Sequence, residues 1–351
     1  MAAPFFYHRR MLRYDFGPRH PLRPERLRRT IELLESLCPD LVIEDPGLAT
    51  DEELRLVHTS EYLAAVARQS ANPVPNASFG FSSGDNPPFV GMDEAARAYS
   101  AGSMRAAERV AGGAPLAFNL AGGLHHAMPS KAAGFCVYND VAMAAVRLAE
   151  TFDSVLYIDI DVHHGDGVQE IAYGHPKVAT FSIHESPLTL WPQTGALHEG
   201  DEKTFNLPVP AGTSGDVWRE AFERSLALVV ERVQPQAIVL QMGIDPHFAD
   251  PLAHLQVAAQ DWLGAVNAVR SLHLPTVATG GGGYNLTTVP RMWAGATLTL
   301  LGRPLDDERL IGVPEEWGFD SFADPNPPRG QNAREMQEIT VAFGERVASL
   351  A

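Results

Sequence analysis

The sequence has few of the features that mark secreted or membrane proteins. It contains two cysteines among 351 residues, Cys38 and Cys136, too few for a disulfide framework or a cysteine-rich zinc site, so we expect a reducing compartment. It has no run of about 18 apolar residues, the length that a membrane-spanning helix needs. The first residues, Met1–Arg10, lack the basic, apolar and small-residue order of a secretory signal. We therefore expect a cytoplasmic protein with no membrane partner.

Basic residues are also scarce. The chain has 27 Lys and Arg against 43 Asp and Glu, which gives a formal net charge of -16 at pH 7. Such an acidic chain is poorly suited to binding DNA or anionic membranes, and it favours neutral or cationic substrates. The sequence also has no basic stripe, nucleic-acid recognition motif or disordered tail. We expect no direct nucleic-acid partner, and a nucleic-acid-binding corepressor scaffold is disfavoured.

Short apolar, β-branched segments alternate with helix-like segments through the middle of the chain. We predict helices over about residues 92–111, 140–152 and 261–272, and another that Ser214 or Asp216 caps and that runs to about Val233. The alternation is typical of right-handed βαβ units, so it predicts an α/β fold with a mostly parallel sheet covered by helices on both faces. The predicted strands begin near Pro115, Ser154, Val178, Ala237 and Thr276.

The composition shows no boundary between domains. We expect a single domain over residues 1–351, although length alone is only a weak guide. The nearest feature to a linker is the stretch from Gln69 to Gly91, which is rich in Asn, Ser, Pro and Gly. We predict that this stretch is a long surface loop, and such loops are often functional.

A cluster of ionisable residues, Asp159–Asp166, directly follows the apolar segment Ser154–Ile158. Burying these groups is costly without a partner, and a divalent metal ion suits carboxylate and imidazole ligands. Because side chains alternate along a strand, Asp159, Asp161 and His163 are predicted to point the same way. The alternative is that the aspartates cap a turn and that His163 is a hydrogen-bonded core histidine.

Reactive side chains also follow three other predicted strands. The adjacent histidines His125 and His126 suit proton transfer, although a pair of surface histidines is as common. Asp245 could complete a three-ligand metal site. Tyr284 follows Gly280–Gly283, a run in which no register matches a phosphate-binding loop, so a mobile or tightly turned tyrosine is favoured. All of these residues are expected at the carboxyl ends of strands, where open α/β sheets place their sites.

These four segments, in this order, resemble the histone deacetylase superfamily of metal-dependent amidohydrolases, particularly its bacterial acetoin-utilisation and acetylpolyamine deacetylase members. The resemblance runs from His20–Arg26 to Tyr284–Leu286 and includes Gly134–Asp140, where Asn139 or Asp140 is also expected to cap a helix. It implies an arginase/deacetylase-like fold and an enzyme that removes an acetyl or other short acyl group from an amine nitrogen. The implied substrate is acetyl-lysine in a protein or peptide, with an acetylated polyamine or another small amide as the alternative.

The resemblance implies two metal sites. Asp161, His163 and Asp245 match the ligands of one catalytic divalent metal, with Zn²⁺ expected and Fe²⁺ left open by this ligand set. Side-chain or backbone oxygens of four residues match a structural potassium site beneath it: Asp159, Asp161, His163 and Ser182.

The resemblance also assigns catalytic roles. His126 matches the general base and acid, and His125 matches its electrostatic partner. Asp159 and Asp166 match the acids that orient these two histidines. Tyr284 matches the hydroxyl that donates to the amide oxygen as it becomes an oxyanion.

Further residues match the family's narrow substrate tunnel, although each could instead be an ordinary core or turn residue. Trp191 stands where the family usually has Phe or Tyr, which implies a narrower or reshaped tunnel. Pro246 and the pair His247–Phe248 also depart from the family pattern and leave substrate choice open. The matched positions are a rim acid, Asp85, wall residues Gly134, Phe135, Trp191 and Leu252, and an arginine near the acetate exit, Arg26.

Two other functions compete with a deacetylase. Arginase-like ureohydrolases share the fold but need extra aspartates for a two-manganese cluster, whereas the ligands here suffice for one catalytic metal. A non-catalytic binding protein could keep the fold as a scaffold, but it would not need the whole set of ligands, histidines and tyrosine. The oligomeric state stays open, and the stretch 69–91 is where a dimerisation loop is to be sought.

Overall fold

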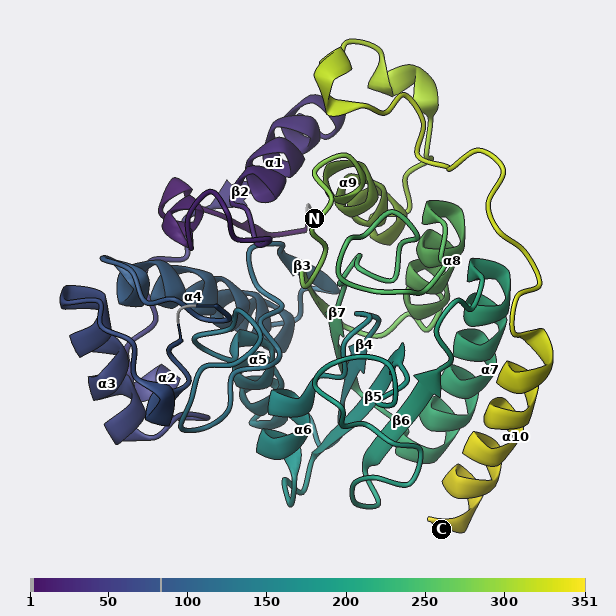
Figure 1. The fold of residues 1–351 in the computed structure, drawn as a ribbon, viewed down its shortest axis with the longest axis horizontal. Helices are drawn as coiled ribbons and strands as arrows, with labels where there is room; N and C mark the ends of the chain where they lie inside the picture. Colours follow the sequence, from purple (N-terminus) through teal and green to yellow (C-terminus); the bar gives the residue numbers. More distant parts are fainter. Residues whose placement is uncertain (1–2, 83, 351) are drawn as a thin grey trace.

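Parallel strands form the centre of the molecule (Figure 1). The computed structural model describes residues 3–82 and 84–350, and within these ranges eight strands form one sheet in the order β2-β1-β3-β8-β7-β4-β5-β6. Every neighbouring pair is parallel, which confirms the predicted α/β class. The strands are β1 (Phe5–Phe6), β2 (Ile43–Glu44), β3 (Leu116–Asn119), β4 (Val155–Asp159), β5 (Val178–Glu185), β6 (Thr204–Val209), β7 (Ala237–Gln241) and β8 (Thr276–Thr279).

Helices cover both faces of the sheet, as predicted (Figure 1). One face packs against α2 (Asp51–Leu54), α3 (Ser60–Ala71), α4 (Met92–Ala111), α5 (Asp140–Ala149) and α6 (Asp166–Ala172). The other packs against α1 (Glu25–Leu37), α7 (Gly215–Val233), α8 (Ala259–Arg270), α9 (Thr288–Leu300) and α10 (Ala333–Ser349). Short 3-10 turns lie at Arg9–Arg13, Ala77–Phe79, Asp307–Leu310 and Glu315–Trp317.

Strand β4 shows why the central strands are apolar on both faces. Val155 and Tyr157 pack into the core beneath α3, α4 and α5, whereas Leu156 and Ile158 pack into the core beneath α7, α8 and α9. Alternate residues of a strand point to opposite faces, so a sheet covered twice needs apolar residues at every position. Burying each large apolar side chain contributes roughly 1.5–3 kcal/mol, which makes this strand a strong fold determinant.

The predicted helices are present, with shifted ends. Helix α4 has the predicted bounds, and α7 begins directly after Ser214. Helix α5 ends at Ala149 rather than near residue 152, because the chain tightens into a turn in which Glu150 N–H bonds to Arg147 and Leu148 carbonyls. Helix α8 begins and ends earlier than predicted, at Ala259 and Arg270.

The stretch from Gln69 to Gly91 is not wholly a surface loop. Gln69 is buried in α3, and Phe81 and Asn86 are also buried. The apolar ring of Phe81 packs against the stacked ring of Tyr62, so hydrophobic burial holds part of this stretch against α3. The composition rich in Pro, Gly and Asn correctly indicated irregular backbone but not its burial.

Parallel pairing brings the functional loops to one edge of the sheet. Strands β3, β8, β7 and β4 are consecutive neighbours, and the loops that follow them begin at the same edge. In this register Asp159 at the end of β4 lies between Ser182 of β5 and Gln241 of β7. Among the described helices, none has both the length and the hydropathy needed to cross a bilayer.

A buried ionic cluster ties the C-terminal segment to this edge. Asp324 pairs with the guanidinium of Arg291, accepts a hydrogen bond from Ala259 N–H at 2.7 Å, and lies 2.8 Å from His247 Nε2. Burial alone would raise the pKa of Asp324, but His247, Ala259 N–H and Arg291 together hold it well below its usual range. The cluster therefore depends on a charged Asp324.

Replacing this carboxylate tests the anchor. We expect Asp324→Asn to lower the free energy of unfolding at pH 7 by about 3–5 kcal/mol, because Arg291 stays buried without its counter-charge. Since the folded pKa is depressed, the contribution is present above about pH 4 and is lost as the pH falls further. Urea denaturation of both proteins at pH 7 and pH 3.5 measures it.

The matched control is Glu338→Gln, which breaks the exposed Arg334–Glu338 pair, with side chains 92% and 67% exposed. That change should cost less than about 1 kcal/mol. Equal losses in the two variants would contradict the anchoring role of Asp324.

Candidate active site

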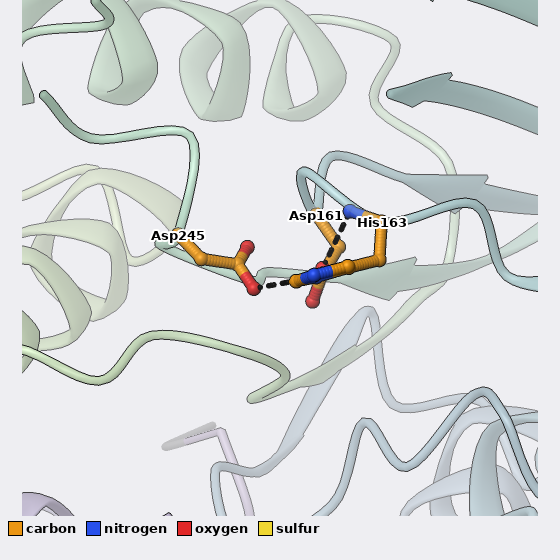
Figure 2. A group of neighbouring side chains, drawn as sticks. All are labelled: Asp161, His163 and Asp245. Atoms are coloured by element: carbon orange, nitrogen blue, oxygen red, sulfur yellow. Dashed lines mark hydrogen bonds and ion pairs between the residues drawn. The ribbon is translucent and has the colours of Figure 1, made fainter. Parts of the chain in front are cut away.

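Three ligand-type side chains converge beyond the ends of β4 and β7. Figure 2 shows Asp161 and His163 approaching Asp245 from a separate loop. One ligand atom from each residue lies within 4.8 Å of the others. His163 Nδ1 is 3.1 Å from Asp245 Oδ2 and 3.3 Å from Asp161 Oδ1. These are the three residues predicted from the sequence as metal ligands.

The local backbone explains why Asp159 is not a member of this group. Strand β4 ends at Asp159, so the side-chain alternation predicted through His163 does not continue. Instead, Asp161 N–H donates to Asp159 Oδ1 at 3.1 Å, and His163 N–H donates to Asp161 Oδ1 at 3.0 Å. The aspartates thus do shape a turn, as the alternative interpretation held, and this turn also brings Asp161 and His163 to Asp245.

The charges of the group favour a bound cation. Both carboxylates are fully buried, and burial together with the charge of Asp161 raises the pKa of Asp245 to about 7. Although burial opposes it, hydrogen bonds to the two carboxylates raise the pKa of His163 to about 10. A proton on His163 thus supplies positive charge that a divalent ion would supply instead, with release of that proton. Two carboxylates and an imidazole therefore fit a metal ion well.

Gln241 supports this group and was not singled out from the sequence. Its Nε2 donates to Asp161 Oδ2 at 2.8 Å and to Gly123 O at 3.2 Å, and its Oε1 accepts from Gly243 N–H at 2.8 Å. The only sequence signal was an amide that ends an otherwise apolar strand. Gln241 thus links Asp161 to the loop that carries the histidines.

Glycines let the backbone approach the carboxylates. A Cβ on Gly243 would lie 2.0 Å from Asp161 Oδ2, and a Cβ on Gly282 would lie 2.0 Å from Asp245 Oδ2. Gly282 N–H also donates to Asp161 Oδ2 at 2.8 Å. Gly281 and Gly283 have φ of 156° and 121°, which L-residues rarely adopt, so the segment before Tyr284 is tightly turned.

The two histidines lie in the turn after β3, and each has its own carboxylate. His125 Nδ1 is 2.7 Å from Asp159 Oδ2, and His126 Nδ1 is 2.7 Å from Asp166 Oδ1. Asp159 Oδ2 also accepts from Tyr157 Oη–H at 2.6 Å. Both imidazoles are buried, at 3% and 4% exposure, so they are not surface histidines.

The surroundings separate the charge states of the two histidines. Burial lowers the pKa of His125, but the charges of Asp159 and Asp161 outweigh it and raise the pKa to about 9. Burial and the neighbouring His125 lower the pKa of His126 to about 4, despite Asp166. At neutral pH His126 is therefore uncharged and can accept a proton, whereas His125 is positively charged.

Tyr284 is held from its backbone rather than through its hydroxyl. Its N–H donates to Asp250 Oδ2 at 2.7 Å, and its ring packs edge-on against Phe135. Desolvation raises its pKa well above 10, so the hydroxyl keeps its proton at neutral pH. Asp250 also accepts from Leu252 N–H at 3.0 Å, which ties the predicted wall residue to Tyr284. Asp250 is a second supporting residue that the sequence analysis missed.

Arg26 is buried rather than exposed on its helix. It donates to Gly281 O at 2.9 Å and to Gly283 O at 2.8 Å, and its guanidinium lies 5.9 Å from the Tyr284 ring centroid. Arg26 therefore braces the glycine turn from α1. These contacts place a positive charge directly behind the tyrosine.

Two of the predicted tunnel residues, Trp191 and Gly134, lie against His126. The Trp191 ring centroid is 4.6 Å from that of His126, and a Cβ on Gly134 would lie 2.3 Å from His126 and 2.7 Å from Trp191. Asp85 Oδ2 accepts from Gly134 N–H at 3.0 Å. Gly134 therefore adjoins both Asp85 and Trp191, and Trp191 is 44% exposed.

Two predicted residues have other contacts. Ser182 lies beside Asp159 in the sheet, but its Oγ is 2.8 Å from His184 Nδ1. His247, which departs from the family pattern, has its Nε2 2.8 Å from Asp324 Oδ2, and its Nδ1 accepts a hydrogen bond from Ala249 N–H. Its ring thus belongs to the C-terminal anchor, because a buried imidazole needs hydrogen-bond partners and finds both there.

Comparison with known proteins assigns the chain to a family. The histone deacetylase domain model matches residues 20–300. The acetoin utilization protein AcuC of Bacillus subtilis (strain 168) is 38% identical over 331 residues, covering 89% of this chain and 84% of the relative. The histone deacetylase clr6 of Schizosaccharomyces pombe is 34% identical over 315 residues, covering 86% and 78%. AcuC of Staphylococcus aureus (strain MRSA252) is 34% identical over 332 residues, covering 89% and 84%. The chain therefore belongs to the histone deacetylase family.

Proposed function

We propose that this deacetylase hydrolyses the amide of acetyl-lysine in a protein or peptide with the help of one divalent metal ion. The observation that carries the proposal is the buried group Asp161, His163 and Asp245 beside a neutral His126. Neither a binding scaffold nor a structural protein needs this costly set of buried charges. We also propose that residues 1–351 act as one catalytic unit, since helices near both ends pack on the same core.

In the proposed reaction Asp161, His163 and Asp245 hold the metal, with Zn²⁺ expected and Fe²⁺ the alternative. The ion would polarise the amide carbonyl and lower the pKa of the attacking water. His126 takes the proton from that water and returns it to the leaving amine. The charge of His125 and the hydroxyl of Tyr284 stabilise negative charge that develops on the carbonyl oxygen.

The carboxylates behind the histidines have a distinct role. Asp159 and Asp166 hold His125 and His126 by Nδ1, so Nε2 is the ring nitrogen with which His126 would exchange protons. We further propose that oxygens of Asp159, Asp161, His163 and Ser182 hold a structural potassium ion. The adjacency of Asp159 and Ser182 across β4 and β5 supports this second site.

The substrate would enter along Trp191, Phe135, Gly134 and Leu252, with Asp85 at the rim. The aromatic side chains suit the methylene chain of an acyl-lysine, and the close packing of Gly134 and Trp191 against His126 favours a small acyl group such as acetyl. An acetylated polyamine also has a methylene chain and an acetamide, so it is the alternative substrate. The acidic character of the protein is compatible with either.

The first test compares the two substrates directly. Acetate release is measured from an acetyl-lysine peptide and from an acetylpolyamine, with metal-loaded protein and with Asp161→Ala as the blank. We expect turnover of the peptide that disappears in the blank. Faster turnover of the polyamine would reverse the substrate assignment, and no turnover of either, despite bound metal, would contradict deacetylation of both substrate classes.

Substitutions of His126 and Tyr284 test the chemistry. We expect His126→Ala to abolish measurable turnover, because it removes the neutral imidazole that the proposed reaction uses as its base. Tyr284→Phe should lower kcat by about 10²–10³ with little change in KM, since its hydrogen bond strengthens only in the transition state. Steady-state kinetics measure both, and a Tyr284→Phe variant with unchanged kcat would remove the tyrosine from the mechanism.

A glycine substitution tests the metal site without removing a ligand. Gly282→Ala would place a methyl group 2.0 Å from Asp245 Oδ2, so the carboxylate must move and metal affinity should fall by about 10–100-fold. Gly84→Ala is the control, because its Cβ meets nothing within 4 Å. Zn²⁺ titration calorimetry measures both, and equal affinity in the two variants would contradict the proposed ligand set.

A further inference from the structure

The loop that carries the two histidines is held by side chains that take no part in the proposed chemistry. Residues 120–127 lie outside any helix or strand, so their backbone groups have no regular ladder of hydrogen bonds. Buried backbone groups must still be paired. Many of the partners come from the start of α5, where Asn139 and Asp140 face this loop.

Asp140 holds the loop just before the histidines. Its carboxylate accepts from Gly123 N–H at 3.0 Å, from Leu124 N–H at 2.9 Å and from Ser103 Oγ–H at 2.5 Å. A Cβ on Gly122 would lie 2.1 Å from this carboxylate, which accounts for the glycine at that position. Gly122 therefore permits the close approach of Asp140.

The cost of this arrangement indicates its importance. Asp140 is fully buried, and among the described residues no Lys, Arg or His side chain forms an ion pair with it. Burying a carboxylate without a counter-charge has a large desolvation free energy. Hydrogen bonds from two backbone N–H groups and one hydroxyl offset this free energy, but only while the loop keeps this conformation. The carboxylate and the loop thus fix each other.

Asn139 holds the loop on either side of His126. Its Nδ2 donates to His125 O at 3.1 Å and to Ala127 O at 2.9 Å, while its Oδ1 accepts from Ala142 N–H at 3.0 Å and caps α5. The predicted capping role is thus confirmed for Asn139, but it accounts for only one end of the side chain. The amide end is directed to the histidine loop.

A third buried side chain completes the support. His58 Nε2 accepts from Asn139 N–H at 2.9 Å, which leaves Nδ1–H to donate to Met128 O at 3.1 Å. Burial lowers the pKa of His58 to about 4, so it is neutral at physiological pH. His58 therefore links the start of α5 to Met128, just after the histidine loop.

We propose that Asn139 and Asp140 are positioning residues that set where His125 and His126 stand relative to the metal ligands. The proposal rests on the proposed function, because it states that residues at the start of α5 fix the positions of the two histidines that the proposed reaction uses. The proposed ligands lie in the loops that follow β4 and β7, and no hydrogen bond found among the described residues joins them to Asn139 or Asp140. Loss of either side chain should therefore impair proton transfer more than metal or substrate binding.

The variant Asn139→Ser separates positioning from helix capping. Serine is a good N-cap, so α5 keeps its cap while the two bonds to His125 O and Ala127 O are lost. We expect kcat to fall about 10- to 100-fold with KM and Zn²⁺ affinity within about twofold of the wild type. Asp140→Asn should act in the same way and should also speed amide exchange at Gly123 and Leu124.

The matched control is Asp261→Asn, since Asp261 is a buried acid in the first turn of α8 that pairs with Arg329. It should lose stability without a fall in kcat at a temperature well below its melting point. Unchanged kcat in Asn139→Ser, or equal losses of kcat, substrate affinity and Zn²⁺ affinity, would overturn the positioning role. Absence of turnover in the wild type would instead overturn the proposed function.

Discussion

Two carboxylates buried side by side are the constraint on which the active centre depends. Asp161 and Asp245 are both fully buried and share one imidazole, so mutual repulsion and desolvation raise the pKa of Asp245 to about 7. Such a pair is tolerated where one carboxyl group takes up a proton or where a cation lies between the two. Much of the surrounding architecture, including Gln241 and the glycine turn, is arranged to keep the pair in place.

Burial and neighbouring charge also give the two histidines different charge states. They are adjacent in sequence and their ring centroids are 4.0 Å apart, yet their pKa values are shifted in opposite directions. His125 lies close to two buried carboxylates, Asp159 and Asp161, whereas His126 pairs with Asp166 alone and lies beside a charged neighbour and an indole. One histidine can therefore supply charge while the other moves protons, without any difference in residue type.

Sequence reasoning located the parts of the site that sit directly after strands. Asp161, His163, Asp245 and the histidine pair could be found because the carboxyl ends of parallel strands meet at one edge, a rule that needs no contact information. The supporting residues could not be found in this way. Gln241 reaches Asp161 across 80 positions of sequence, and Asp250 reaches Tyr284 across 34, so no local pattern records either bond. The side-chain alternation predicted from Asp159 to His163 fails because turn-forming bonds of Asp159 and Asp161 end the extended backbone there.

The space around three glycines determines which positions near the site can accept a larger side chain. Gly243, Gly282 and Gly134 have no room for even one methyl group, so variation on that side of the pocket is closed. Trp191, by contrast, is 44% exposed, and its ring lies at a steep angle to that of His126, the proposed general base. An enzyme selected for a larger acyl group, in nature or in the laboratory, must therefore change at Trp191 rather than at these glycines.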